Sequence, residues 1–315
     1  MLKYLVILLD DKAASYCYYE PKGICNEKHS SQSGLIGLQD LKEGIRFAML
    51  ENLNIQFVYP NFDLPQEYKE LIHSIDHSSV RFATSGEQAE VYVIEGFEML
   101  HATELREDGV YVLRCKRQEL MTRKEDIKAL FGKIRRLNVV FTDMETFDEK
   151  DFELYKEALI EFADALSETL KTGQDFQFNL LTDRVMLEQM NNCEAGIENI
   201  TLAPNGKFYL CPAFYYENAD DCIGTLSEGL DIKNRQLLKL KYAPLCRVCD
   251  CYQCKRCVWL NRRLTLEVNT PSHAQCVVSH LERNASMYLI EKTGLNAKEI
   301  KEIDYLDPFD VREQW

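Results

Sequence analysis

The sequence contains no apolar run that approaches the eighteen or so residues of a membrane-spanning helix. Its first apolar run, residues 5–9, stops at Asp10 and Asp11. That run is too short for the core of a secretion signal, and no small-residue cleavage site follows it. We therefore expect a cytoplasmic protein without a membrane partner.

Positive charge is also scarce. The chain has 37 Lys and Arg against 51 Asp and Glu, a formal net charge of −14. A nucleic-acid partner requires a basic surface that neutralises phosphates, so we expect no such partner. A solubilising acidic surface is the simpler interpretation of the charge.

Extremes of composition are absent as well. Hydrophobic residues make up 46% and charged residues 28% of 315 residues. These values exclude a disordered, collagenous or coiled-coil chain as a whole. The length allows one large domain or two ordinary ones, each with its own core.

The first 190 residues alternate short apolar runs with helical patterns. The clearest helix follows Asp148, where an apolar stripe at three-and-four spacing runs from residue 152 to 170 and Gly173 ends it. This rhythm predicts an α/β fold with a parallel sheet, either a partial (βα) barrel or an open sheet. The expected strands are residues 4–9, 55–59, 91–94, 110–113, 137–142 and 176–181.

The pattern changes near Asn191, after which Cys, Asn, Gly and Tyr are frequent. Residues 201–210 read as a hairpin with Asn205 and Gly206 as a two-residue turn, and residues 277–292 read as a helix. We therefore expect three parts. They are a βα domain at 1–190, a small cysteine-rich domain at 191–290 and a C-terminal tail at 291–315.

Cysteine is the residue type that the chain has in excess. Twelve are present, and nine fall within the 84 residues from 193 to 276. In a reducing compartment, thiols this dense indicate metal ligands rather than disulfides. The nine are Cys193, Cys211, Cys222, Cys246, Cys249, Cys251, Cys254, Cys257 and Cys276.

Residues 246–257, here called the cysteine loop, hold five thiols in twelve residues. CxxC turns let two thiolates point at one metal or cluster, whereas inert buried thiols would not alternate with polar residues. From Lys241 to Arg263, six basic residues face one acidic residue, a local charge of +5. Cations would stabilise an anionic iron–sulfur cluster, or they could meet an acidic partner or peptide.

The spacing of these cysteines resembles a SPASM domain, the C-terminal auxiliary iron–sulfur module of many radical S-adenosylmethionine (SAM) peptide maturases. Cys193, twelve residues, Gly206, four residues and Cys211 match its first half. The second half departs from the SPASM pattern. Four residues rather than five separate Cys249 from Cys254, and two rather than three separate Cys254 from Cys257.

The resemblance implies one or two four-iron–four-sulfur clusters. One ligand set would be Cys246, Cys249, Cys254 and Cys276. The other would be Cys193, Cys211 and Cys257. Cys222 or Cys251 could complete the second set, or the position could stay open. A single cluster with unused thiols, or zinc, is the alternative.

The first half resembles the βα barrel of radical SAM enzymes, but it lacks their CxxxCxxC motif. The loop after the first strand has only Cys17 and Cys25, and two thiols cannot make the three-ligand site. We therefore expect no SAM binding.

A barrel-like half without this motif, followed by a SPASM-like half, resembles the CXXX repeat peptide maturases, as do residues 55–60, 202–206 and 257–262. The resemblance implies an accessory maturase for a ribosomally made, cysteine-repeat peptide that works with a partner radical SAM enzyme. The clusters would relay electrons or ligate a peptide thiol. Whether the chain is itself an enzyme stays open.

Two other functions are compatible with these residues. A non-catalytic peptide- or partner-binding module would use zinc or iron–sulfur only as a structural staple. A zinc hydrolase ranks last, because catalytic zinc usually has fewer sulfur ligands.

No catalytic residue stands out. Asp10 and Asp11 end the first strand, where a barrel presents its active site, but acidic residues at such positions are usually just solvated. His273 could replace a thiol as a ligand, although a surface histidine is the more common case.

Overall fold

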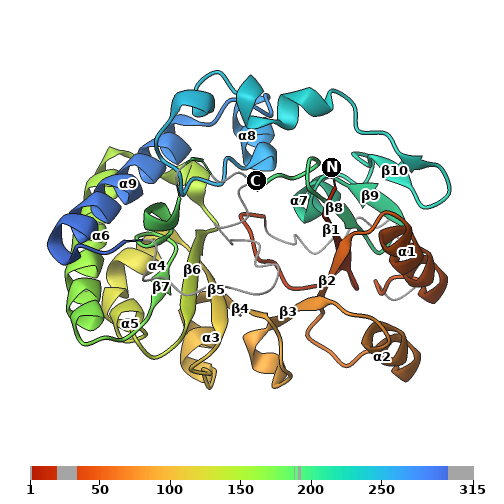
Figure 1. Ribbon diagram of the computed structural model, residues 1–315, viewed down its shortest axis with the longest axis horizontal. Coiled ribbons are helices and arrows are strands. Elements are labelled where there is room, and N and C mark those ends of the chain that lie inside the picture. Colours follow the sequence, from red (N-terminus) through yellow and green to blue (C-terminus); the bar gives the residue numbers. More distant parts are fainter. Residues whose placement is uncertain (1, 20–33, 188, 191–192, 297–315) are drawn as a thin grey trace. The chain divides into compact units, whose positions relative to one another are not determined.

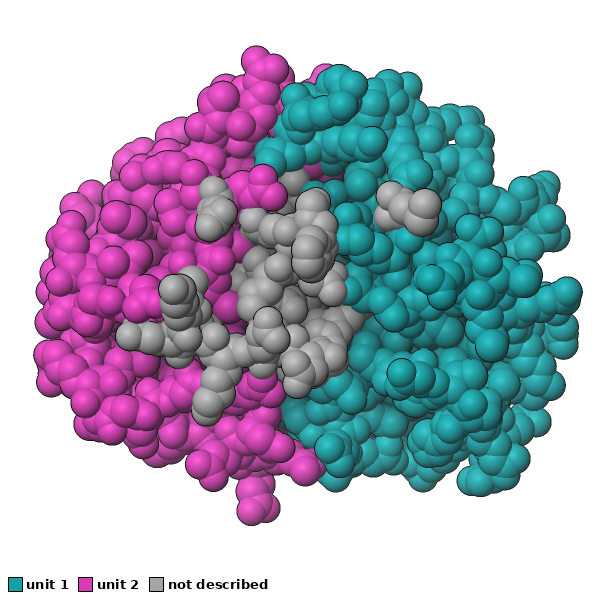
Figure 2. All heavy atoms as spheres, in the orientation of Figure 1, with its two compact units in different colours: residues 1–93, 194–242 teal, residues 94–193, 243–315 magenta. Residues whose placement is uncertain are grey.

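The computed structural model describes residues 2–19, 34–187, 189–190 and 193–296. Cys25 and most of the expected C-terminal tail lie outside the described residues. The chain divides into two compact units, coloured separately in Figure 2. Unit 1 contains residues 1–93 and 194–242, and unit 2 contains residues 94–193 and 243–315. The domain boundaries at 190 and 290 stay predictions.

Unit 1 contains a mixed sheet with strand order β11-β10-β9-β8-β1-β2-β3-β4. Neighbours from β8 to β4 are parallel, and those from β8 to β11 are antiparallel. The strands are β1 (Tyr4–Leu8), β2 (Asn54–Val58), β3 (Ser78–Phe82), the start of β4 (Val91–Glu95), β8 (Asn199–Leu202), β9 (Lys207–Tyr209), β10 (Gly224–Thr225) and β11 (Gly229–Leu230). Its helices are α1 (Leu38–Leu50), α2 (Gln66–His73) and α7 (Pro212–Glu217), with 3-10 turns at Ala83–Ser85, Arg235–Leu238 and Leu240–Tyr242.

The core of unit 1 forms around β1, which is apolar along its whole length because both faces are covered. Ile7 pairs with Phe57 of β2 on one side and with Leu202 of β8 on the other. The buried stripe of α1, including Leu41 and Ile45, belongs to the same apolar cluster. A strand from late in the chain therefore sits directly beside the first strand.

The predicted hairpin is confirmed, since Leu202 of β8 pairs with Phe208 of β9. Its predicted two-residue turn is wrong, because four residues, 203–206, connect the strands. The Ala203 N–H donates to the Lys207 carbonyl (3.0 Å), and the Gly206 N–H donates to the Ala203 carbonyl (3.0 Å). Gly206 takes a φ of +73°, a conformation that favours glycine.

The described part of unit 2 contains the end of β4 and parallel strands in the order β5-β6-β7. They are β5 (Val110–Cys115), β6 (Arg136–Phe141) and β7 (Gln177–Phe178). Its helices are α3 (Gly96–Ala102), α4 (Arg117–Thr122), α5 (Lys124–Lys128), α6 (Glu149–Lys171), α8 (Val258–Thr265) and α9 (His273–Thr293), with 3-10 turns at Met144–Thr146, Asp183–Met186 and Cys246–Val248. Among the described residues, no helix is both long and apolar enough to cross a membrane.

The long helix α6 forms as the sequence predicts. Asp148 caps it by accepting a hydrogen bond from the Asp151 N–H (2.9 Å), and Gly173 follows its end at φ +80°. Its buried stripe packs Phe162 against Phe131 and Phe178. This apolar seam fixes α6 against the strands of unit 2.

Helix α9 lies beside α6 (Figure 1). The Tyr288 hydroxyl and Lys292 ammonium both donate to the Asp164 carboxylate of α6, at 2.8 and 2.5 Å. The predicted helix at 277–292 is confirmed, but α9 begins earlier, because Ser272 caps it by accepting from the Gln275 N–H. This docking holds α9 in a defined place in unit 2.

Candidate metal centre

The backbone of the cysteine loop folds into tight turns. The Cys249 N–H donates to the Cys246 carbonyl (3.1 Å), and the Cys254 N–H donates to the Cys251 carbonyl (3.0 Å). The Cys251 N–H also points at the Cys249 sulfur, at 3.5 Å. These turns are those expected of CxxC-type ligand segments, in which backbone amides surround the sulfur.

Helix α9 holds the cysteine loop from the other side of the site. The buried Gln253 side-chain amide donates to the Ser279 carbonyl (2.7 Å), and Arg283 pairs with Asp250 (3.2 Å). Cys276 and His280 stand four residues apart on α9, so they share one face of the helix. The loop and α9 therefore present their side chains to a common region of unit 2.

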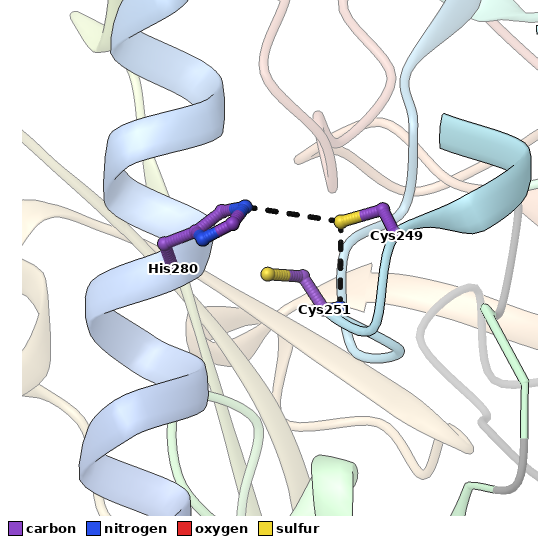
Figure 3. Close-up of side chains that lie close together, drawn as sticks. All are labelled: Cys249, Cys251 and His280. Carbon is purple, nitrogen blue, oxygen red and sulfur yellow. Dashed lines mark hydrogen bonds between the residues drawn. The ribbon is translucent and has the colours of Figure 1, made fainter. Parts of the chain in front are cut away.

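Three potential ligand atoms converge there. The sulfurs of Cys249 and Cys251 and a ring nitrogen of His280 all lie within 4.8 Å of one another (Figure 3). The Cys249 sulfur is 3.8 Å from His280 Nε2. Tetrahedral zinc places its sulfur and nitrogen ligands about 3.5–3.8 Å apart. The group could therefore hold a metal ion.

The thiols of the first predicted cluster set are also neighbours. Burial, followed by the charges of Cys254, Cys276 and Cys249, raises the pKa of Cys246 to about 12. Burial likewise raises the pKa of Cys276, with added contributions from Cys254 and Cys249. A metal that binds these thiols must displace their protons, so metal affinity will rise with pH.

The donor set fits an iron–sulfur cluster. Each thiolate of such a cluster binds its own iron atom, so the sulfurs lie farther apart than those around one zinc ion. The Arg256 side chain is 1% exposed and opposes the rise in the Cys246 pKa, which means that its positive charge lies near the thiols. A buried cation of this kind would offset the charge of an anionic cluster.

The remaining predicted ligands have other contacts. The Cys193 N–H donates to the Lys255 carbonyl of the cysteine loop (3.0 Å). The Cys257 sulfur caps α8 by accepting from the Leu260 N–H (3.4 Å). Cys211 precedes α7 and Cys222 contributes to the raised pKa of Tyr209, both in unit 1. The second ligand set stays a prediction.

The histidine at the site is not the one that the sequence suggests. The His273 ring lies edge-on to Phe152, with centroids 6.1 Å apart, and belongs to the first turn of α9. His280 contacts the Cys249 sulfur instead. The sequence could have indicated His280 through its position four residues after Cys276 on a predicted helix. That spacing places both side chains on one face of the helix.

The acidic residues after β1 differ from expectation. Asp10 is only 3% exposed and accepts a hydrogen bond from the Lys12 N–H (2.8 Å), so the interpretation as a solvated residue is wrong for it. Asp11 accepts a hydrogen bond from the Tyr215 hydroxyl. Burial, with the negative charge of Asp11, raises the pKa of Asp10.

Replacing Asp10 with asparagine is expected to stabilise the protein at pH 7. The raised pKa means that the folded state binds the Asp10 proton more tightly than the unfolded state does. The wild type therefore loses stability as pH rises above the ordinary value of 3.8, whereas asparagine stays neutral and keeps the acceptor for Lys12. Urea unfolding at about pH 3.5 and about pH 7 measures the free energy of unfolding of both proteins. The variant should be more stable than the wild type only at the higher pH. Asp63→Asn, at a side chain 82% exposed, is the control and should show no such pH-dependent gain.

The chain has an α/β fold with a parallel sheet, like that of a radical SAM partial barrel, together with a cysteine-rich C-terminal region. No protein-family model matches the chain, and no curated protein does.

Several solved structures of anSMEcpe, a radical SAM/SPASM anaerobic sulfatase-maturating enzyme, share this fold. The form with bound AdoMet is 10% identical, with a TM-score of 0.61, over 95% of this chain and 97% of that one. Forms with AdoMet and the Kp18Cys or Cp18Cys peptide are 12% and 11% identical, with TM-scores of 0.58 and 0.60. Each covers 92% of this chain and 99% of the other.

The residues after β1 do not fit the SAM-cleaving cluster of such enzymes. Three thiolates are needed, and the sequence between β1 and α1 offers only Cys17 and Cys25, of which Cys25 lies outside the described residues. No step of SAM chemistry is therefore assigned to this chain.

Proposed function

We propose that the protein is an accessory maturase for a ribosomally made, cysteine-repeat peptide, acting in the cytoplasm with a partner radical SAM enzyme. The observation that carries this proposal is the attachment of the cysteine loop to α9, which brings the thiols of Cys254 and Cys276 into one region of unit 2. The proposal is supported by the similarity of the fold to that of anSMEcpe, a maturase whose structure was solved with the bound peptides Kp18Cys and Cp18Cys.

The proposed cofactor is an iron–sulfur cluster held by thiols of the cysteine loop and α9. Cys246, Cys254 and Cys276 would be among its ligands, and Cys249 is the fourth that the SPASM resemblance implies. A bound cluster supplies one-electron chemistry or an iron atom that ligates a thiolate. The chain's own residues would position the thiols, exclude water and offset negative charge through Arg256.

Peptide binding tests the proposed partner. The probe is a synthetic peptide with cysteine at every fourth position, and the control peptide has serine at those positions. The anaerobically purified protein should bind the cysteine peptide at least about tenfold more tightly, since the metal would ligate its thiolate. Isothermal calorimetry measures both affinities. Equal affinity for the two peptides would contradict a role in which the metal ligates the peptide thiol. Electron relay would then be the remaining role of the cluster.

Modification of the peptide tests the relay. The partner radical SAM enzyme should convert the cysteine peptide only when the iron-loaded chain is present. Full conversion supported by an iron-free preparation would contradict the redox version of the proposal.

A second candidate, a non-catalytic binding module with structural zinc, is favoured by the close spacing of Cys249, Cys251 and His280. It predicts a colourless zinc protein whose residues 193–276 unfold on chelation. Iron, sulfide and zinc assays with a visible spectrum separate this candidate from the first, and circular dichroism before and after chelation measures the unfolding.

A further inference from the structure

We infer that Cys249, Cys251 and His280 form a mononuclear divalent-metal site, separate from the iron–sulfur site, with a fourth coordination position open to an external thiolate. The identity of that thiolate as a peptide cysteine rests on the proposed function. The metal site itself rests only on the geometry of unit 2.

The geometry fits one ion rather than a cluster. The three ligand atoms lie within 4.8 Å of one another, and the Cys249 sulfur is 3.8 Å from His280 Nε2. Ligands around a single tetrahedral zinc need this proximity, with bonds of about 2.3 Å to sulfur and about 2.0–2.1 Å to nitrogen. Two thiolates and one imidazole are a donor set that zinc accepts readily.

The elements that carry the three ligands are fixed to each other. The Gln253–Ser279 hydrogen bond (2.7 Å) joins the cysteine loop to the same turn of α9 that carries His280. The Arg283–Asp250 ion pair (3.2 Å) adds a second link one turn farther along. A site on two braced elements keeps its ligand geometry without the metal.

Cys249 belongs to both candidate sets, and the structure favours the histidine set. Its sulfur faces His280 Nε2 and the Cys251 N–H. Among the described residues, the thiols of Cys246, Cys254 and Cys276 do not join this group within 4.8 Å, as expected of ligands that each bind their own iron atom. Assigning Cys249 to the single ion leaves Cys246, Cys254 and Cys276 for the cluster.

The fourth position has no protein ligand in the described part of the chain. No further Cys, His, Asp or Glu there joins the group of three within 4.8 Å. His280 is exposed and Cys249 is half-buried, so an external ligand can reach the ion. Sites with three protein ligands are those in which zinc binds water or substrate. A thiolate is the external ligand that a two-sulfur zinc site prefers by softness.

Cobalt(II) titration of the metal-free, full-length protein tests the site. The wild type should bind Co²⁺ at this site with tetrahedral d–d bands and thiolate-to-metal charge-transfer absorption. His280→Ala should weaken this binding at least about 100-fold, whereas His273→Ala, on the same helix but against Phe152, should change it less than about twofold. Cys251→Ala should weaken it as His280→Ala does. Equal affinity in the His280→Ala and His273→Ala variants would overturn the site.

Added thiol tests the open position. Either 2-mercaptoethanol or the cysteine-repeat peptide should raise the charge-transfer absorption by about half, as two thiolates become three. No change with 2-mercaptoethanol would overturn the open position. A change with 2-mercaptoethanol but none with the peptide would keep the site and count against the proposed function alone. Iron and sulfide should be equal in wild type and His280→Ala, and their loss in that variant would show a shared site and overturn the separation.

Discussion

Replacing Cys276 with alanine is expected to remove about four iron and four sulfide ions per chain from the anaerobically purified protein. Cys276 is the thiol that α9 contributes to the group, and it lies close enough to Cys254 and Cys249 for their charges to raise its pKa. A cluster that loses a protein ligand becomes exposed to solvent and is lost on purification. Iron and acid-labile sulfide assays, with the visible spectrum, measure the effect.

Cys115→Ala is the matched control for this prediction. Cys115 is a buried thiol at the end of β5 and is not part of the cysteine loop or of α9. It should keep the wild-type iron and sulfide content. If Cys276→Ala also kept that content while its circular dichroism matched the wild type, Cys276 would not be a ligand.

The second large effect concerns stability. Asp183→Ala should destabilise the protein by about 3–5 kcal/mol, because it leaves a buried guanidinium without its counter-charge. Arg136 of β6 donates from both terminal nitrogens to the two Asp183 oxygens, at 2.9 and 3.0 Å, and also to Gln177 (3.2 Å). The Arg136 and Asp183 side chains are 0% and 2% exposed. Urea unfolding at neutral pH, followed by circular dichroism, measures the change.

Two variants calibrate this result. Arg136→Met with Asp183→Leu should recover most of the loss, since a buried pair can be replaced by apolar groups at little net cost. Lys156→Ala removes an exposed pair with Glu153, whose side chains are 59% and 74% exposed, and should cost less than about 0.5 kcal/mol. Equal losses in Asp183→Ala and Lys156→Ala would contradict the account of the buried pair.

Local patterns in the sequence predicted most elements because those elements follow local rules. The apolar runs became β1, β2, β4, β5 and β6, and the Asp148 cap and Gly173 stop enclosed α6. The strand β3 was missed because its first two residues are serines. The structure explains how a serine is accommodated in this strand: the Glu90 carboxylate accepts hydrogen bonds from the Ser79 N–H (2.6 Å) and hydroxyl (2.8 Å).

Long-range pairing was beyond reach. Nothing near Ile200 or Leu202 indicates that β8 lies parallel to β1, since the two strands are separated by most of the chain. The strands of the predicted hairpin join the sheet of unit 1 through this pairing.

In the candidate site, too, local patterns were predictable and long-range contacts were not. Spacing alone identified the thiols of the cysteine loop, because CxxC turns are local. His280 was missed because it lies 31 residues from Cys249 in the sequence and reaches it only through the docking of α9. Asp10 was misjudged for a similar reason, since its burial depends on segments that the sequence around it does not include.

Thiols of the cysteine loop and α9 should bind metal, with iron–sulfur among the bound forms. The decisive measurement is Mössbauer spectroscopy of anaerobically purified, ⁵⁷Fe-enriched protein, with zinc measured in the same sample. We expect the quadrupole doublet of a four-iron cluster, together with about one zinc ion per chain. Protein that contains neither iron nor zinc, with its thiols free or joined as disulfides, would rule out metal binding by these thiols.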